Sequence, residues 1–145
     1  MYLIEKEFNI AISHRLSCHK GLCKFLHGHN LQLLVGVMSD KLNSDGMVID
    51  FSELKRIVNE GISEWDHAAF FNSSDSEFVE FSKKNNLRLK LVDGDPTSEN
   101  LCRLLFNFVE MKLDMEGYSN VKIHHVTIYE TNSSKCTYTG DNKCY

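Results

Sequence analysis

Two segments near the N-terminus alternate between apolar and polar side chains, and this alternation limits the fold more than any other feature. In residues 2–14 the apolar side chains share even-numbered positions, and in residues 27–37 they share odd-numbered positions. They are Ile4, Phe8, Ile10 and Ile12 in the first segment and Leu31, Leu33, Val35 and Val37 in the second. A period of two is typical of a strand with one buried face, because successive side chains point to opposite faces of a sheet. We therefore expect two half-buried β-strands.

The remaining segments predict helices followed by two further strands. The expected elements are, in order, a turn at 43–46, a helix beginning near Asp50, a short helix over 76–84, a helix after Pro96, and strands over 121–130 and 135–139. The short helix lies in an otherwise polar excursion over 72–95, and Asp50 could form a capping box with Glu53. The order ββ, helices, ββ predicts an α+β fold in which helices cover one face of an antiparallel sheet. We expect a single domain over residues 1–145.

Composition excludes several classes of protein. The net charge of −4 argues against a general nucleic-acid-binding protein, since that function needs a basic surface. The first residues lack the apolar core of a secretory signal, and no stretch approaches the roughly 20 apolar residues that cross a membrane. We therefore expect a cytoplasmic protein that binds neither nucleic acid nor membrane. The five cysteines form no CxxC pair, which favours free thiols over disulfides.

Three histidines continue the apolar faces of the two predicted strands. His14 has the even parity of the first segment, and His27 and His29 have the odd parity of the second. If the strands pair, the three imidazoles meet and leave one position open, as in a catalytic zinc site. Cys23 or Cys18 could instead complete a closed, structural zinc site. The alternative without a metal is that these are ordinary histidines at the ends of two strands.

Six segments of the chain form an ordered set of motifs. They are SHRL (13–16), CKFLHGHN (23–30), GMVIDFSELK (46–55), DHAAFFN (66–72), PTSENL (96–101) and YETNSSKCTYTG (129–140). This set resembles the 6-pyruvoyl-tetrahydropterin synthase family, and the cysteine four residues before HGH is similar to the bacterial 6-carboxy-tetrahydropterin synthase branch. The resemblance implies the T-fold, a ββααββ antiparallel sheet with two main helices on one face. It also implies homo-oligomers, as trimers or stacked hexamers, with active sites between subunits.

The resemblance further implies catalytic residues. Cys23 matches the reactive cysteine of the family, whose thiolate would be stabilised beside a zinc cation. Asp66 and His67 match the catalytic pair, in which a carboxylate fixes the tautomer of an imidazole and supports a proton relay. Without the resemblance, Cys23 would be interpreted as a small buried side chain, and Asp66 with His67 as a polar pair at a helix end.

Pterin-binding residues follow from the same resemblance. Glu130 matches the glutamate that accepts two hydrogen bonds from the amino-pyrimidinone edge of the ring. Thr97, Ser98 and Glu99 match a second segment that contacts the ring. Thr97 or Ser98 could, however, simply cap the helix that follows. Taken alone, Glu130 would be interpreted as a solvated charge at the end of a strand.

The family implies a zinc-dependent lyase whose substrate is 7,8-dihydroneopterin triphosphate. Zinc would act as a Lewis acid on the side-chain oxygens of that substrate. In the carboxy branch the products are 6-carboxy-5,6,7,8-tetrahydropterin, acetaldehyde and triphosphate, and the pterin enters the deazapurine pathway to queuosine. One alternative is the 6-pyruvoyl product, which forms without carbon–carbon cleavage. A second alternative is a non-catalytic protein that binds zinc or a pterin.

One position departs from the carboxy branch. The final motif reads TYTG, where many members carry an arginine before the glycine. A cation that would help to hold the triphosphate is therefore missing. The candidate substitutes are Arg15, Lys20, Lys24 and Lys135, and the sequence does not choose among them.

Overall fold

The two alternating segments form the centre of the sheet. The structure is a computed structural model that describes residues 1–140. In it, β1 (Tyr2–His14) and β2 (His27–Ser39) pair antiparallel over their whole length, so that His14 lies opposite His27. Ile10 and Ile12 of β1 and Leu33 and Val35 of β2 are buried, which confirms the predicted parity of both strands.

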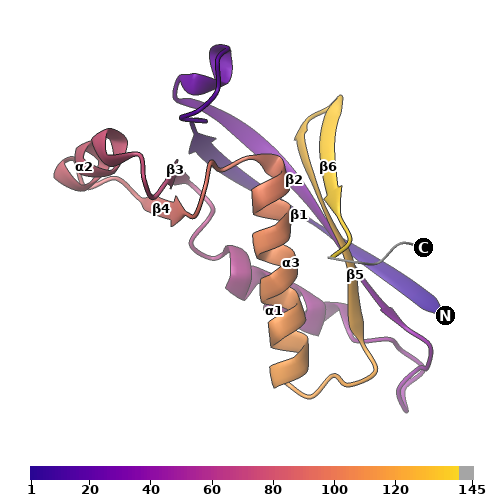
Figure 1. Cartoon of the computed structure of the whole chain (residues 1–145). Helices are drawn as coiled ribbons and strands as arrows, with labels where there is room; N and C mark the ends of the chain where they lie inside the picture. The colour runs from indigo at the N-terminus through magenta and orange to yellow at the C-terminus, as the bar shows by residue number, and fades with distance from the viewer. Residues whose placement is uncertain (141–145) are drawn as a thin grey trace.

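The other elements extend this pair into a six-stranded sheet with the order β4-β3-β1-β2-β5-β6 (Figure 1). In chain order they are the short 3₁₀ helix η1 (Leu22–Lys24), α1 (Phe51–Ile62), β3 (Ala68–Asn72), α2 (Ser76–Lys84), β4 (Leu89–Val92), α3 (Ser98–Met115), β5 (Lys122–Thr131) and β6 (Ser134–Tyr138). The helices expected after Asp50 and Pro96, the short helix over 76–84 and the two C-terminal strands are all present.

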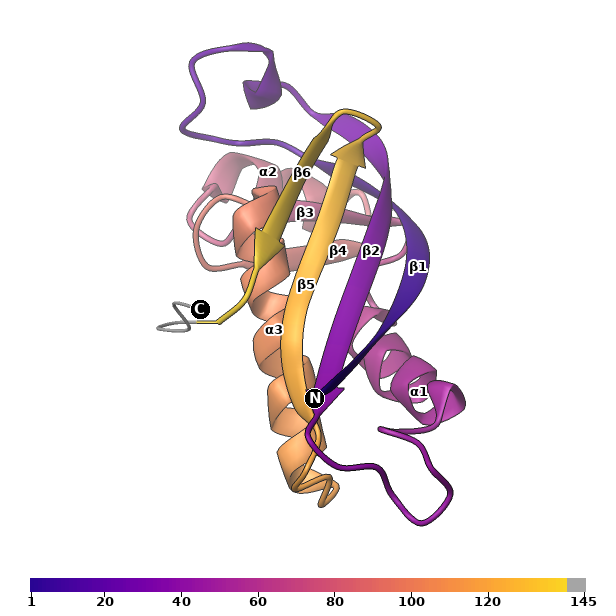
Figure 2. The same ribbon diagram turned by 90° about the vertical axis from the view of Figure 1, so that its right-hand side faces the viewer.

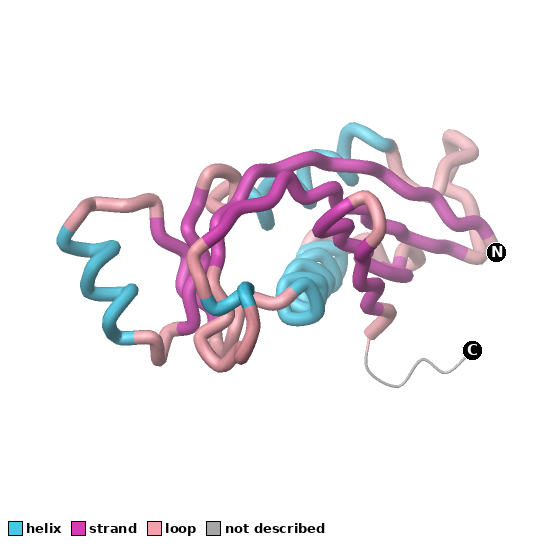
Figure 3. Tube along the Cα trace, turned by 90° about the horizontal axis from the view of Figure 1, so that it is seen from above, coloured by secondary structure: helices cyan, strands magenta, loops and turns pink. Residues whose placement is uncertain are grey.

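Helices α1 and α3 cover one face of the sheet, as the element order predicts. Figure 2 shows β1, β2, β5 and β6 in front of both helices, and Figure 3 shows the sheet curling around α3. The buried stripe of α3 includes Leu101, Leu105 and Val109, and these side chains share one hydrophobic core with Val35 and Val126 of the sheet. Each fully buried aliphatic side chain of this kind stabilises the fold by about 1.5–3 kcal/mol. The α+β class is therefore confirmed.

Two short strands were missed by the sequence prediction. β3 pairs parallel with β1, and β4 pairs parallel with β3, so the sheet is not wholly antiparallel. The segment from Ala68 to Phe71 is apolar at every position and buried at every position. Continuous apolar runs are typical of parallel strands that are covered on both faces, and they lack the alternation by which the other strands were recognised. Because β4 (Leu89–Val92) lies within the 72–95 excursion, part of that excursion is sheet and not loop.

The start of α1 differs from the predicted capping box. The Asp50 side chain caps the helix by accepting a hydrogen bond from the Ser52 N–H at 2.6 Å. The Glu53 carboxylate instead pairs with Arg56 at 3.1 Å and accepts from the Tyr118 hydroxyl at 3.3 Å. Asp50 alone therefore provides the predicted cap.

Two exclusions from the sequence can be compared with the described part of the chain. Within residues 1–140, Cys18, Cys23, Cys102 and Cys136 are free thiols, and Cys144 lies outside the described residues. Over the same residues, no helix has the length and apolar character that crossing a membrane requires.

Candidate metal centre and active site

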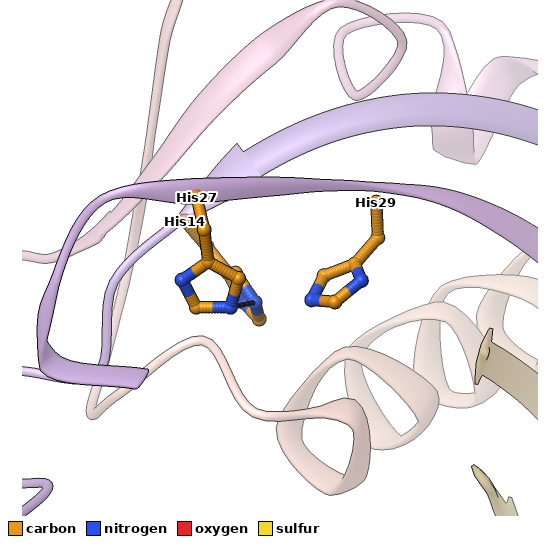
Figure 4. A group of neighbouring side chains, drawn as sticks. All are labelled: His14, His27 and His29. Carbon is orange, nitrogen blue, oxygen red and sulfur yellow. Dashed lines mark hydrogen bonds between the residues drawn. The ribbon is translucent and has the colours of Figure 1, made fainter. Parts of the chain in front are cut away.

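The three predicted histidines lie together at one end of the central strands (Figure 4). His14 is the last residue of β1 and lies opposite His27, the first residue of β2, while His29 lies opposite Ile12. Side chains two apart on a strand share a face, so Gly28 separates two rings that point the same way. One nitrogen from each of the three rings lies within 4.8 Å of the others. Pairing of the two strands is thus sufficient to assemble the cluster.

Backbone carbonyls fix the orientation of two of these rings. His14 Nδ1 lies 2.8 Å from the carbonyl oxygen of Pro96, and His27 Nδ1 lies 2.8 Å from that of Phe25. A carbonyl can only accept, so each ring donates its proton through Nδ1 and carries a lone pair on Nε2. Metal-binding histidines usually have this second contact, which fixes their tautomer.

The arrangement of lone pairs fits a bound cation. The Nε2 atoms of His14 and His27 lie 3.1 Å apart, and with both protons on Nδ1 neither atom can donate to the other. Two Zn–N bonds of 2.0–2.1 Å at a tetrahedral angle would separate their nitrogens by about 3.4 Å. Burial lowers the pKa of His14, which favours the neutral form that binds metals. The donor set therefore suits zinc, and three nitrogens leave one position of a tetrahedron for another group.

Glu130 brings a carboxylate to the edge of this cluster. Its Oε1 atom lies 3.6 Å from His14 Nε2 and 3.7 Å from His29 Nε2. The register of β5 against β6 shifts between Tyr129 and Thr131, so Glu130 occupies a β-bulge. A bulge re-aims a side chain that regular alternation would place elsewhere. The family resemblance predicts that Glu130 binds the pterin ring. In the structure, Glu130 also lies beside the histidines.

Cys23 lies in the loop that leaves β1 after His14 and returns to β2 at His27. It is the middle residue of η1, and its side chain is partly buried. The carbonyl oxygen of Cys23 accepts a hydrogen bond from the N–H of Leu16 at 2.9 Å, which closes the loop on itself. The loop therefore brings Cys23 back towards the ends of the two strands that carry the histidines. Cys18 of the same loop is exposed.

Asp66 and His67 contact each other, but they lie apart from the cluster. His67 Nδ1 is 3.0 Å from Asp66 Oδ2, and Asp66 Oδ1 accepts from the N–H of Ala11 at 2.9 Å. This backbone hydrogen bond is the main reason that the pKa of Asp66 lies below its ordinary value. The His67 side chain is 78% exposed. Across residues 1–140, no hydrogen bond or ion pair joins either residue to His14, His27 or His29.

The segment before α3 contributes both predicted and unpredicted groups. The Thr97 side chain caps α3 by accepting from the Asn100 N–H at 3.3 Å, as the alternative interpretation of Thr97 proposed. Ser98 and Glu99 form the first turn of the helix, where Glu99 is exposed. The carbonyl of Pro96 was missed, because a backbone contact across the fold leaves no signal in residue type.

The four candidate phosphate-binding cations differ in how far their charges are already paired within the chain. Arg15 Nε lies 3.1 Å from Asp75, and the Arg15 guanidinium stacks 4.1 Å from the centre of the Phe78 ring. Arg15 is therefore already held by α2 and its cap. The other three, Lys20, Lys24 and Lys135, are exposed.

The fold and the site define an α+β protein with a three-histidine group suited to a metal ion, bordered by a carboxylate and a cysteine-bearing loop. The family model of 6-pyruvoyl tetrahydropterin synthase matches residues 3–141. The chain belongs to the 6-pyruvoyl tetrahydropterin synthase family, as its motifs predicted.

One sequence relative agrees with this assignment, and solved structures share the fold. The chain is 34% identical to 6-carboxy-5,6,7,8-tetrahydropterin synthase of Haemophilus influenzae, over 95% of this chain and 99% of that protein. A solved structure of an uncharacterized protein from Wolinella succinogenes has a TM-score of 0.80 at 23% identity and covers 97% of this chain and 98% of its own. The 6-pyruvoyl tetrahydropterin synthase of Caenorhabditis elegans has a TM-score of 0.71 at 25% identity, over 97% and 96%. These likenesses confirm the T-fold.

Proposed function

We propose that this protein is a zinc-dependent 6-carboxy-5,6,7,8-tetrahydropterin synthase. It converts 7,8-dihydroneopterin triphosphate to 6-carboxytetrahydropterin, acetaldehyde and triphosphate, and its product enters the deazapurine pathway to queuosine. The observation that carries the proposal is the convergence of lone pairs from His14, His27 and His29 beside the loop that bears Cys23. The 34% identity to the Haemophilus influenzae synthase supports the carboxy product.

His14, His27 and His29 hold the zinc ion. Bound there, zinc supplies a Lewis acid for the oxygens of the substrate side chain. The carbonyls of Pro96 and Phe25 keep two of the imidazoles in the ligand tautomer, so little reorganisation is needed when the metal enters.

Cys23 and the pair of Asp66 and His67 move protons at the substrate side chain. Cys23 is the base in this proposal. Asp66 holds the Nδ1 proton of His67, which leaves Nε2 of that ring free to accept a proton. The exposure of His67 in the single chain supports a site completed between subunits. In that arrangement His67 acts on substrate bound at the histidine cluster of a neighbouring copy, and the enzyme is a trimer or hexamer.

The pterin ring is bound by Glu130 and the first turn of α3. The Glu130 carboxylate accepts from the ring's amino group and adjacent N–H, and its distance from the histidines brings the side chain of the pterin towards the metal. Thr97, Ser98 and Glu99 border the ring on the other side. The Thr97 hydroxyl accepts from the Asn100 N–H and keeps its own O–H to donate, and Ser98 and Glu99 offer further polar groups.

The deciding experiment incubates zinc-loaded protein with 7,8-dihydroneopterin triphosphate and identifies the products by mass spectrometry. We expect 6-carboxytetrahydropterin and acetaldehyde, with no product from protein treated with a chelator. Formation of 6-pyruvoyltetrahydropterin would instead assign the alternative activity within the family. Metal-loaded protein that binds a pterin without converting it would contradict an enzymatic function.

A further inference from the structure

Asp95 connects two parts of the candidate site that are distant in sequence. Its carboxylate accepts a hydrogen bond from Ser17 Oγ at 2.6 Å and another from the N–H of Cys18 at 3.0 Å. Asn72 Nδ2 donates to the same carboxylate at 3.3 Å. Ser17 and Cys18 belong to loop 15–26, the loop that carries Cys23. The Asp95 side chain therefore anchors that loop to the segment just before α3.

The backbone around Asp95 is held by separate contacts. The carbonyl oxygen of Asp95 accepts from Asn100 Nδ2 at 2.8 Å and from the Thr97 N–H at 2.8 Å. The next carbonyl, that of Pro96, accepts from the ring of His14. One short segment thus contacts the loop through a side chain and a histidine of the metal cluster through its backbone. This geometry fixes the loop relative to the cluster.

The contact extends from Asp95 towards Cys23. Leu16, next to Ser17, donates its N–H to the carbonyl of Cys23 at 2.9 Å. Burial alone would raise the pKa of Asp95, but the hydrogen bonds from Ser17 and Cys18 outweigh burial and hold the pKa below its ordinary value. The carboxylate is therefore ionised, and hydrogen bonds to an ionised acceptor are stronger than neutral ones.

We propose that Asp95 is a positioning residue, which holds loop 15–26, and with it Cys23, in place relative to the histidine cluster. The inference rests on the proposed function, because Cys23 is a base only in that function. Asp95 itself touches neither the metal nor the substrate. Its effect on turnover passes through the loop.

The test compares Asp95→Ala, Asp95→Asn and Asp93→Ala in the full-length zinc-loaded protein. Alanine removes every hydrogen bond of the carboxylate. Asparagine keeps an oxygen for the Cys18 N–H and can reverse the bond to Ser17 Oγ, but its amide N–H faces the Asn72 amide, which also donates. Asp93 is an exposed carboxylate two residues away and controls for charge and location. Ser17→Ala removes the contact at 2.6 Å, together with a weak contact to Cys18 Sγ at 3.8 Å, and leaves the start of α3 untouched, so it serves if Asp95→Ala folds poorly.

Two readouts separate positioning from general stability. Trypsin cleaves after Lys20 and Lys24, both exposed in loop 15–26, so its initial rate reports how firmly the loop is held. For Asp95→Ala we expect faster loop cleavage and a kcat lower by about 10- to 100-fold, because small misplacements of a catalytic group cost this much. We expect zinc content to be unchanged and KM to change by less than about threefold, since binding groups stay in place. Asp95→Asn should restore both readouts in part, since it keeps the Cys18 contact but loses the charge, and Ser17→Ala should show the same changes as Asp95→Ala at smaller size.

Equal cleavage and turnover in Asp95→Ala and Asp93→Ala would overturn the inference. Loss of zinc from Asp95→Ala in parallel with activity would also overturn it, because Asp95 would then act on the metal site and not on the loop. If the unsubstituted protein forms no pterin product, the proposed function fails. The comparison of loop cleavage rates would still decide whether Asp95 anchors the loop.

Discussion

His14 Nδ1 lies 2.8 Å from the carbonyl oxygen of Pro96, a residue 82 positions further along the chain. This contact orients a ring that is only 2% exposed, and a similar carbonyl contact orients His27. His29 differs from both: within residues 1–140 its one polar neighbour outside the cluster is Glu130, at 3.7 Å. The cluster therefore contains two rigid rings and one that is less constrained.

Replacing His29 should remove the metal with little damage to the fold. His29→Ala leaves two nitrogens, and we expect zinc affinity to fall by more than about 100-fold because one of three protein ligands is lost. Thermal unfolding without metal should change little, since the ring is not buried in the core. Competition with a chromophoric zinc chelator measures the affinity. His19→Ala, at an exposed histidine of loop 15–26, is the matched control and should bind zinc normally.

The histidine cluster could be predicted because strand alternation is a local property. Parity places His14 on one strand and His27 and His29 on the next, and antiparallel pairing then brings the rings together. The same argument cannot reach Pro96, whose carbonyl meets His14 only because of how α3 packs on the sheet. Contacts made by backbone atoms carry no signature in residue type.

The position of Glu130 and the strand β3 escaped prediction for different reasons. Glu130 lies near the rings because β5 carries a bulge at that residue, and a bulge breaks the alternation on which strand arguments depend. The strand that begins at Ala68 is buried along its whole length, so it shows no alternation at all. Sequence patterns therefore located the histidines, which lie on regular strands. They did not locate the bulge at Glu130 or the fully buried strand β3.

Cys23→Ala should abolish turnover and leave zinc bound. The thiol is the proposed base, whereas the metal is held by histidines, so the two functions separate. We expect at least a 1,000-fold loss of kcat, on the order of the effect of removing a catalytic base or nucleophile, with a zinc content equal to that of the parent. Metal analysis and steady-state kinetics on the same sample measure both. Cys18→Ala is the control at a neighbouring exposed thiol, and loss of zinc from Cys23→Ala alone would mean that the thiol is a fourth ligand.

Glu130→Gln distinguishes a pterin anchor from a metal ligand. The amide can accept one of the two ring hydrogen bonds but carries no charge, and we expect the dissociation constant for a pterin to rise by about 10- to 100-fold, as the loss of a charge-assisted hydrogen bond predicts. Zinc affinity should stay within a few-fold of the parent. Quenching of pterin fluorescence and chelator competition give the two values. Glu110→Gln, at an exposed carboxylate of α3, controls for the change in net charge. The opposite pattern, weak zinc binding with normal pterin binding, would assign Glu130 to the metal.

Thr97→Ala should affect stability more than pterin binding. The Thr97 hydroxyl caps α3 through the Asn100 N–H at 3.3 Å, and removal of such a cap lowers the free energy of unfolding by about 1 kcal/mol. Urea unfolding measures this loss, and Thr97→Ser should recover most of it because the hydroxyl remains. If Thr97→Ala binds a pterin as weakly as Glu130→Gln does, the hydroxyl contacts the ring and our interpretation as a cap is wrong.

A group of exposed ion pairs between α1 and α3 predicts how stability changes with pH. Arg56 pairs with Glu53 and Glu116 and, at 2.7 Å, with Glu60. The hydrogen bond from Arg56 is the largest cause that lowers the pKa of Glu116 to about 2. A depressed carboxylate pKa stabilises the fold above the ordinary value near 4.5 and loses this effect as the pH falls towards 2.

Arg56→Gln should therefore lower the urea midpoint at neutral pH, and the difference from the parent should shrink as the pH falls from about 4.5 towards 2, where the partner carboxylates become protonated. The difference should also shrink in 1 M salt, because the pairs are exposed and are screened. Lys55→Gln removes an equal charge from the neighbouring position of α1, which has no ion pair with any residue in 1–140, and should match the parent at every pH. A deficit of Arg56→Gln that stays constant across pH and salt would mean that the arginine stabilises the helices by packing of its apolar stem and not by its charge.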